Sequence, residues 1–260
     1  MSSVLYVYAV TRQAIVPDAE AIDGSRRFGT ASAAEVHAVF TPVSADEFSQ
    51  EVIDRRAGDL EWLGAIGYRH QSVVSALMKE TALVPLRAFT LFSGEEAVRA
   101  YLEEHRELLA KTLDRLEGKQ EWTLRIELEP SKWSEALTVR VASLRELQSD
   151  IAAASAGKAF LLRKKLEDEK KRASRTAEEE LVGEIEQAVL AKLRCETVAE
   201  SRARREGGFP QINVLINRDE ESVLQELETE LGARYAPEGV TLALSGPWPP
   251  YTFAGGNTER

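Results

Sequence analysis

The C-terminal segment Thr241–Phe253, with the sequence TLALSGPWPPYTF, joins a predicted strand to a proline-rich tail. Leu242 and Leu244 alternate with a threonine and an alanine, and this two-residue period is typical of a β-strand. The sequence Ser245-Gly246-Pro247 should end the strand, because proline has no backbone N–H to donate to a sheet. We therefore expect the last strand to cover Val240 to Leu244.

The tail beyond this strand combines rigid prolines with large aromatic side chains. Pro249 and Pro250 predict an extended polyproline II segment, which has no internal hydrogen bonds. Such a tail either packs on its own protein or docks into a groove of a partner. Trp248, Tyr251 and Phe253 can each bury ~150–250 Å² of surface area. We therefore expect the tail to pack on its own chain, near the junction of the two halves.

The second half of the chain, from Trp122 onward, has the predicted order strand, long helix, strand, strand, helix, strand. This is the ferredoxin-like β-α-β-β-α-β plan. Thr197–Arg204 is a weak, charged strand and should lie at a sheet edge, with Gly207-Gly208 as a hairpin turn before the next strand. The residues expected to alternate in this sheet are Trp122, Leu124, Ile126, Ile212, Val214, Ile216, Leu242 and Leu244.

A long helical region rich in charge, about Ser143 to Leu193, follows the first of these strands. Its middle part, Arg163–Glu180, contains only one large apolar residue, Leu166. A solvated face predicts few core contacts, so Leu166→Ala should cost well under the ~2–5 kcal/mol of a buried truncation. The alternative is an arm that projects toward another protein. Acidic residues alternate with the basic ones in this region, and this pattern argues against nucleic-acid binding.

Local helix signals add detail to this half of the chain. Pairs at i,i+4, Glu167 with Lys171 and Asp168 with Arg172, should support the charged helix. Thr176 and Glu179 match a capping box, which predicts a break and restart of the helix. Asn217 and Glu220 match another capping box and should start the helix before the last strand.

The first half of the chain mixes strands and helices, and its strand order does not follow from the sequence. The helix predicted after Ser93, with Glu96 as its capping-box partner, should end at Gly118, a left-handed C′ residue. Gly64 and Gly67 weaken the start of the preceding helix. The predicted elements are strands at Val4–Val10 and Glu35–Val43, helices at Ala45–Ile53 and Asp59–Glu80, and an extended segment at Leu83–Phe92.

The fold class expected from these elements is α+β with two domains. The boundaries are 1–118 for a mixed α+β N-terminal domain, 119–245 for a ferredoxin-like C-terminal domain with long helices, and 246–260 for the tail.

Composition narrows the functional class. The 260 residues carry a formal net charge of −10, which argues against a nucleic-acid binder. Cys195 is the only cysteine, so an internal disulfide is excluded and a reducing compartment is expected. The apolar start of the chain lacks a basic segment and is short, so it predicts a strand rather than a signal peptide. No apolar run approaches the ~20 residues of a membrane helix. These features are typical of a soluble cytoplasmic protein.

Motifs for catalysis or metal binding are missing from the sequence. His37, His70 and His105 are far apart and match no zinc-binding spacing. We find no G-x-S-x-G elbow, no local Cys–His signature and no phosphate-binding glycine fingerprint. We therefore expect no enzymatic activity, no metal and no cofactor.

Three segments together resemble the gas vesicle protein GvpF/GvpL family. They are Arg69–Phe92, with a Pro-Leu-Arg strand after a His…Val-Val helix, Glu95–Trp122, and Gly246–Phe253 with the sequence GPWPPYTF. The stretch that starts at Phe160, FLLRKKLEDE, is also similar to the family. One departure follows Arg87, where the family usually has Phe-Gly-Thr and this chain has Ala88-Phe89-Thr90.

The resemblance implies a non-enzymatic accessory or minor structural protein of gas vesicle formation, which belongs to the F-like branch, to the L-like branch or to a divergent paralogue. It implies the small hydrophobic shell protein GvpA and other accessory Gvp proteins as partners, with no membrane and no small-molecule substrate. The candidate partner-binding residues are Arg87, Lys164, Lys165, Lys171, Arg172, Trp248, Tyr251 and Phe253. The alternative is a ferredoxin-like ligand-binding protein or haem-dependent enzyme, with a pocket at His70 or His37.

Overall fold

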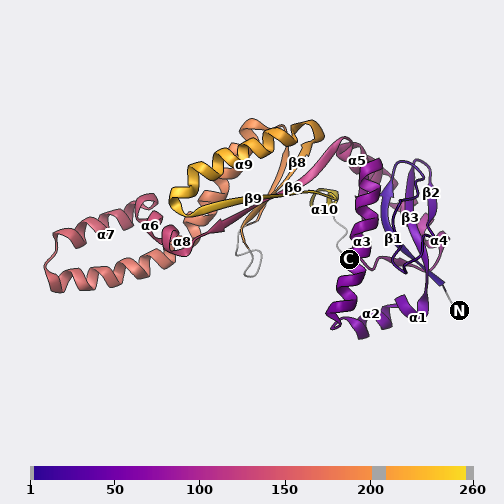
Figure 1. Ribbon diagram of the computed structural model, residues 1–260, viewed down its shortest axis with the longest axis horizontal. Helices are drawn as coiled ribbons and strands as arrows, with labels where there is room; N and C mark the ends of the chain where they lie inside the picture. Colours follow the sequence, from indigo (N-terminus) through magenta and orange to yellow (C-terminus); the bar gives the residue numbers. More distant parts are fainter. Residues whose placement is uncertain (1–2, 201–208, 256–260) are drawn as a thin grey trace. The chain divides into compact units, whose positions relative to one another are not determined.

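The computed structural model describes residues 3–200 and 209–255. The chain divides into two compact units (Figure 1). Unit 1 comprises residues 1–121 and 247–260, and unit 2 comprises residues 122–246. Each unit has its own sheet, its own helices and its own hydrophobic core, so the α+β class expected from the sequence is confirmed.

Unit 1 contains a five-stranded sheet with the order β2-β3-β1-β4, and β5 also pairs with β1. The strands are β1 (Ser3–Thr11), β2 (Gly29–Ala33), β3 (Val36–Ser44), β4 (Leu83–Pro85) and β5 (Leu91–Phe92). The register of β1 against β3 shifts between Val7 and Ala9, which leaves Tyr8 at a bulge. From Leu5 to Thr11 every residue of β1 is buried, as expected for a central strand that is covered on both faces.

Helices pack on both faces of this sheet (Figure 1). They are α1 (Ala45–Phe48), α2 (Gln50–Arg56), α3 (Leu60–Glu80), α4 (Glu95–Glu104), α5 (Arg106–Leu116) and α10 (Tyr251–Ala254). α3 buries Ile66, Val73 and Leu77 against the tyrosines of β1. α4 and α5 contact β2, β3 and β4.

Several details of unit 1 differ from the prediction. α3 runs without interruption through Gly64 and Gly67, and the side chain of Asp59 caps its start. Ser93 is not a capping residue: α4 begins at Glu95, and the N-cap Gly94 makes no side-chain hydrogen bond. The predicted single helix is divided at His105, whose side chain bonds the Tyr101 carbonyl.

Other predictions for unit 1 were incomplete. The segment 45–53 forms two short helices, and the segment 83–92 forms two short strands with a turn between them. β2 was not predicted, because its sequence GTASA has small residues and no marked alternation. Gly118 has a φ of +70°, as predicted for the residue that ends the helix.

Unit 2 contains a four-stranded sheet with the order β7-β8-β6-β9. This is the ferredoxin-like order, so the predicted plan is confirmed. The strands are β6 (Lys119–Leu128), β7 (Glu196–Glu200), β8 (Gln211–Asn217) and β9 (Val240–Trp248). β7 lies at the sheet edge as expected, whereas the predicted turn at Gly207-Gly208 lies outside the described residues.

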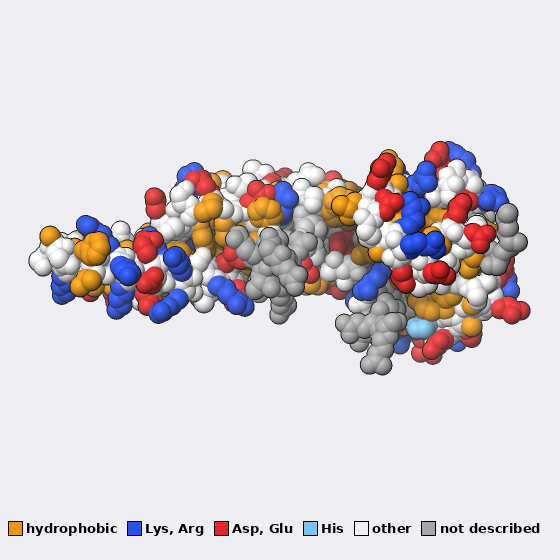
Figure 2. Space-filling view, turned by 90° about the horizontal axis from the view of Figure 1, so that it is seen from below, with side chains coloured by type: hydrophobic (Ala, Val, Ile, Leu, Met, Phe, Trp, Pro, Cys, Tyr) orange, Lys and Arg blue, Asp and Glu red, His pale blue; other side chains and the backbone are white. Residues whose placement is uncertain are grey.

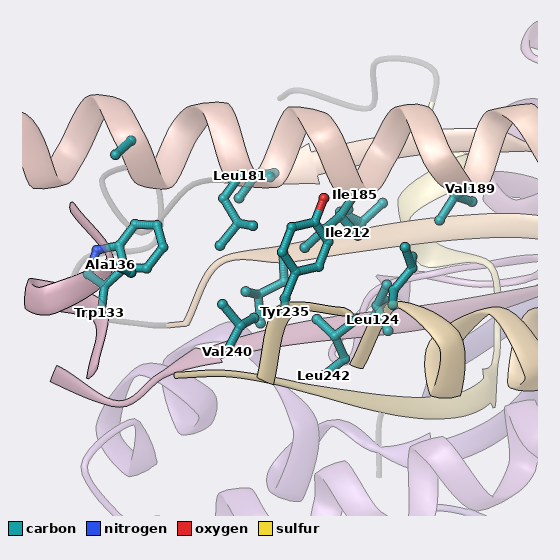
Figure 3. Close-up of a cluster of buried hydrophobic side chains, with 14 of the residues drawn as sticks. Leu124, Trp133, Ala136, Leu181, Ile185, Val189, Ile212, Tyr235, Val240 and Leu242 are labelled. Carbon is teal, nitrogen blue, oxygen red and sulfur yellow. The ribbon is translucent and has the colours of Figure 1, made fainter. Parts of the chain in front are cut away.

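The helices of unit 2 are α6 (Pro130–Arg140), α7 (Ala142–Ala153), α8 (Ala156–Lys192) and α9 (Glu221–Tyr235), with 3-10 turns η2 (Arg218–Glu220) and η3 (Ala236–Glu238). Figure 3 shows the core between α8, α9 and the sheet. Leu124, Ile212 and Leu242 come from three neighbouring strands, and Leu181 and Ile185 pack on them from α8.

Polar contacts fix the ends of these helices. The capping box of Asn217 and Glu220 is confirmed, although it starts a 3-10 turn that leads into α9. Arg140 donates to both oxygens of Glu184, at 3.0 and 3.1 Å, and also bonds Glu238. Tyr235 donates to the same Glu184 carboxylate at 3.1 Å. This cluster ties α6 and α8 to α9 and η3.

Three predictions for unit 2 were wrong. α6 was not predicted, although proline, here Pro130, is favoured in the first turn of a helix. α8 continues through Thr176 and Glu179 without a break. β9 extends through Pro247 to Trp248, which is possible because β9 is an edge strand and needs no donor on its outer side.

Among the described residues, no helix combines the length and the apolarity that crossing a bilayer requires.

Candidate partner-binding surfaces

A buried histidine of α3, His70, joins four segments of unit 1. Its side chain is 3% exposed. Nδ1 lies 3.0 Å from the hydroxyl of Tyr6, and Nε2 lies 3.1 Å from the carbonyl of Leu86 and 3.0 Å from the hydroxyl of Tyr251. Strand β1, helix α3, the turn after β4 and the C-terminal tail therefore meet at one imidazole ring.

The hydrogen-bond pattern assigns the proton of this ring. The Tyr6 hydroxyl accepts from the backbone N–H of Phe89 at 3.1 Å, so its own proton is free to reach Nδ1 of His70. Nδ1 is then the acceptor, and the ring proton sits on Nε2. The carbonyl of Leu86 is an obligate acceptor, so Nε2–H is shared between it and the oxygen of Tyr251.

Burial controls the titration of this cluster. It lowers the pKa of His70 to about 4, because the charged imidazolium would lose its hydration. Burial also raises the pKa of Tyr251 to about 12. At neutral pH the ring and the phenol are therefore both uncharged, and they act as structural hydrogen-bonding groups.

Two further contacts hold the tail on unit 1. The backbone N–H and the hydroxyl of Thr252 donate to the carboxylate of Glu121, at 3.1 and 2.7 Å. Arg115 of α5 donates to the carbonyl of Phe253, whose side chain is 5% exposed. Burial raises the pKa of Glu121, opposed by its bonds from Thr252. The expectation that the tail packs on its own chain is confirmed for Tyr251 and Phe253, and the tail turns into the short helix α10 instead of remaining extended.

The docked tail forms one wall of an open groove in unit 1. The groove has a volume of about 840 Å³. It lies between the β4 turn, the α4–α5 pair and the tail, and its apolar lining includes Leu86, Phe92, Tyr101 and Leu108. Such a concave, mostly apolar surface is typical of a binding site.

Arg87 is exposed at the rim of this groove, on a strained turn. Phe89 has a φ of +67°, which is unusual for a residue with a side chain. This is the position where the resemblance to the family expects glycine. The ring of Phe89 packs 5.4 Å from that of Trp62, and its N–H bonds Tyr6, so packing and hydrogen bonding hold the left-handed conformation in place.

A helical hairpin of unit 2 carries the other predicted site residues. α7 and the first half of α8 pack side by side and extend beyond the sheet of this unit (Figure 1). Leu166 is 8% exposed and belongs to the core of unit 2, together with Ala177. The expectation of few core contacts in Arg163–Glu180 is therefore wrong: α6 and α7, which pack on α8, cover the side that was expected to be solvated.

Lys164, Lys165, Lys171 and Arg172 of this hairpin are exposed, and the ion pairs of α8 differ from the prediction. The i,i+4 pairs do not form; Glu167 pairs with Lys170 at 3.3 Å and Glu169 pairs with Arg172 at 3.1 Å, both at i,i+3. Lys164, Lys165 and Lys171 also face solvent.

The structure thus divides the predicted site residues into two groups. Arg87 and Tyr251 line the same groove, and Phe253 is buried beside it. Trp248, which is 43% exposed, stands at the end of β9. The four cations Lys164, Lys165, Lys171 and Arg172 belong to α8 in unit 2. Sequence reasoning missed Glu121 and Arg115, because only the folded chain brings them to the tail.

His37 and Cys195 are residues of types that often act in catalysis, and both are held in structural environments. Ser32 bonds Nδ1 of His37 at 2.7 Å. Burial raises the pKa of the Cys195 thiol to about 11, so it is a poor nucleophile at neutral pH. In the segments 3–200 and 209–255, no group of three or more His, Cys, Asp or Glu side chains is arranged to hold a metal ion.

A family model described as gas vesicle synthesis protein GvpL/GvpF matches residues 4–255. The chain belongs to this family. Gas vesicle protein L of Streptomyces sp. (strain CB03234) is 30% identical over 259 residues, which cover 96% of this chain and 92% of that protein. Gas vesicle protein L1 of Halobacterium salinarum is 28% identical and covers 75% of this chain and 72% of that protein.

Solved structures share the fold of this GvpL/GvpF family member. The crystal structure of GvpF from Anabaena sp. PCC7120 superposes with a TM-score of 0.67 at 17% identity, over 100% of this chain and 99% of that chain. GvpF from Microcystis aeruginosa gives a TM-score of 0.64 at 14% identity, over 98% of this chain and 100% of that chain. The likeness in fold therefore extends over the residues of both units.

Proposed function

We propose that this chain is an accessory or minor structural protein of gas vesicle formation. It binds the small hydrophobic shell protein GvpA and other accessory gas vesicle proteins, and it acts in the cytoplasm and at the growing vesicle. The observation that carries the proposal is the family match across residues 4–255, which spans both units. A hydrophobic subunit that polymerises needs a partner that covers its apolar surface before assembly, because exposed apolar patches drive aggregation.

The geometry of His70 supports a binding role over the haem or small-ligand alternative. A haem-ligating histidine must offer a ring nitrogen to iron. In this chain Tyr6 occupies Nδ1, and Leu86 and Tyr251 occupy Nε2. Both ring nitrogens form hydrogen bonds that hold the tail and the turn after β4 in place.

The tail supplies a surface for the shell protein. Trp248 is 43% exposed and stands between Pro247 and Pro249, whose restricted φ angles lower the entropy lost on binding. An exposed tryptophan on a rigid backbone is typical of a binding hot spot. Tyr251 and Phe253 anchor this segment to unit 1, so its position is fixed before a partner arrives.

Co-expression with GvpA, followed by capture of this chain through a tag, tests the proposal. The wild-type chain should retain the shell protein, and Trp248→Ala should reduce the amount retained at least several-fold. Leu60→Ala is the matched control, because Leu60 is an apolar residue of unit 1 that is 82% exposed. If the wild-type chain retains no shell protein, the proposed function is wrong. If both variants retain it equally, the tail is not the binding surface.

A further inference from the structure

The end of the helical hairpin in unit 2 carries two large apolar side chains that are open to solvent. Residues 152–157, with the sequence AAASAG, lie at the turn between α7 and α8 and have only small side chains. Phe160 and Leu161 follow this turn and are 69% and 67% exposed. Figure 2 shows hydrophobic side chains at the far end of the hairpin, with Lys and Arg side chains beside them. Such an exposed apolar end indicates a surface that another molecule covers.

We define the tip as residues 151–166, and its charge is opposite to that of the chain. Its sequence, IAAASAGKAFLLRKKL, holds four cations and no acid, whereas the whole chain carries −10. The acid that precedes it, Asp150, offsets only one of these charges. Within the described part of the chain, no tip cation forms an ion pair or a side-chain hydrogen bond. The four cations are all exposed, and they are Lys158, Arg163, Lys164 and Lys165.

Helical spacing places a cation beside each of the two apolar side chains. Lys164 stands four residues after Phe160, and Lys165 stands four residues after Leu161. Residues four apart are neighbours on one face of a helix. The aliphatic part of each lysine can then lie along an apolar surface while its ammonium group stays in a polar layer. Apolar side chains with cations beside them are typical of a segment that binds the surface of an anionic membrane.

We propose that the tip binds peripherally to an anionic lipid bilayer. Phe160 and Leu161 enter the boundary between the headgroups and the acyl chains, and the four cations remain among the lipid phosphates. The tip is the convex end of a projecting hairpin (Figure 1). An acidic protein would need a preformed pocket to bury two large side chains at such an end, whereas a bilayer accepts them without one. Membrane contact of this kind is independent of shell-protein binding, and it does not follow from the family resemblance, which implies no membrane partner.

The contact should be weak and sensitive to salt. A short apolar insertion alone binds a membrane only marginally, and a basic cluster beside it supplies the second attraction that detectable binding requires. We therefore expect half of the protein to be bound at on the order of 0.1–1 mM accessible lipid. The negative charge of the rest of the chain opposes the contact only weakly, because charges more than ~8–10 Å apart are screened at physiological ionic strength.

Co-sedimentation of the full-length chain with lipid vesicles tests the proposal. Vesicles of phosphatidylcholine with about 30% phosphatidylglycerol should bind the wild-type chain, and pure phosphatidylcholine should bind it about ten-fold less. Raising the salt to ~0.5 M NaCl should weaken the binding several-fold. The variant Phe160→Ser with Leu161→Ser and the variant Lys164→Glu with Lys165→Glu should each bind about ten-fold less than the wild type.

Matched substitutions outside the tip are the controls. Leu60→Ser changes a leucine of unit 1 that is 82% exposed. Lys79→Glu with Lys111→Glu makes the same change in net charge at two exposed lysines of unit 1. Both controls should bind anionic vesicles like the wild type. Equal losses in the control and in the tip variants would show that overall charge, and not the tip, governs binding, and would overturn the proposal.

Tryptophan emission distinguishes insertion from adhesion by charge alone. Anionic vesicles should shift the emission of Phe160→Trp to shorter wavelength relative to the wild type, but not that of Tyr68→Trp, at a position that is 77% exposed. The proposal is wrong if the wild-type chain does not bind anionic vesicles at low salt, if the tip variants bind like the wild type, or if Trp emission at position 160 does not shift. Retention by immobilised polyglutamate without binding to vesicles would assign the tip to an acidic protein and would overturn the proposal as well.

Discussion

Leu166→Ala measures whether the charged part of α8 is a packed element or a solvated arm. The side chain of Leu166 is 8% exposed and lies in the core cluster of unit 2. The substitution removes three buried carbon groups, which corresponds to ~2.4 kcal/mol of transfer free energy at ~0.8 kcal/mol each. A residual cavity adds to this cost, but a hairpin that is covered on few sides can relax around it. We expect a loss of ~2–3 kcal/mol in the free energy of unfolding.

Leu161→Ala is the matched control on the same helix. Its side chain is 67% exposed, so the substitution should change the free energy of unfolding by less than ~0.5 kcal/mol. Urea unfolding, followed by circular dichroism, gives both values, and amide exchange along α8 shows whether the loss is local. Equal and small effects of the two substitutions would refute the packing of the hairpin and restore the solvated helix that the sequence predicts.

Four other predictions concern unit 1. Tyr251→Phe removes one hydrogen bond to His70 and should lower the free energy of unfolding by ~0.5–1.5 kcal/mol, whereas Tyr68→Phe, at a position that is 77% exposed, should have no effect in the same urea titration. Because burial lowers the pKa of His70 from 6.5 to about 4, the unfolded chain binds a proton in this range that the folded chain does not. Stability should therefore fall by up to ~1.4 kcal/mol per pH unit as the pH drops from 6.5 to 4, and His70→Gln should make the measured slope shallower by that amount. Phe89→Gly should be more stable than Phe89→Ala by ~1 kcal/mol in urea unfolding, because both lose the ring and only glycine adopts a φ of +67° without strain; equal stability would contradict a left-handed turn. Deletion of residues 246–260 should lower the melting temperature by ~5–10 °C through loss of the buried Phe253, and an unchanged melting temperature would show that the tail does not stabilise unit 1.

The plan of unit 2 follows from the sequence because its local signals agree with one another. Trp122, Leu124 and Ile126 alternate cleanly, and all three are buried in the sheet. The capping box at Asn217 marks the turn into α9. Each signal acts over a few residues, so it is visible without knowledge of the fold.

Predictions failed where a distant segment decides the local structure. Pro247 predicts the end of a strand, but β9 is an edge strand and can include a proline. Leu166 is one apolar residue in a charged segment, which predicts exposure to solvent, but α6 and α7 pack on this part of α8. The break at Thr176 was predicted from a capping pattern that helix propagation and packing override. Sheet order and helix–helix packing do not appear in a pattern a few residues long.

The candidate sites show the same limit. Aromatic content and prolines predict a docked tail, yet nothing near Tyr251 in the sequence points to His70, which lies 181 residues earlier. The groove was not predicted at all, because its walls come from β4, the α4–α5 pair and the tail. The resemblance proposed Arg87 and the aromatic residues of the tail as partner-binding residues, and in the structure Arg87 and Tyr251 line one groove.

The Glu121–Thr252 contact explains how unit 1 can hold a tail that is separated from it by all of unit 2. The chain leaves unit 1 after Glu121 and returns at Pro247. Within unit 1, the carboxylate of Glu121 accepts two hydrogen bonds from Thr252. The residue at which the chain leaves unit 1 therefore binds the segment that returns to it. β6 and β9, which carry the chain out and back, are neighbours in the second sheet. Folding of unit 2 therefore brings the tail to the place where it docks. The pairing of β6 with β9, rather than the contacts of the tail, offsets the entropy lost in closing a loop of more than a hundred residues.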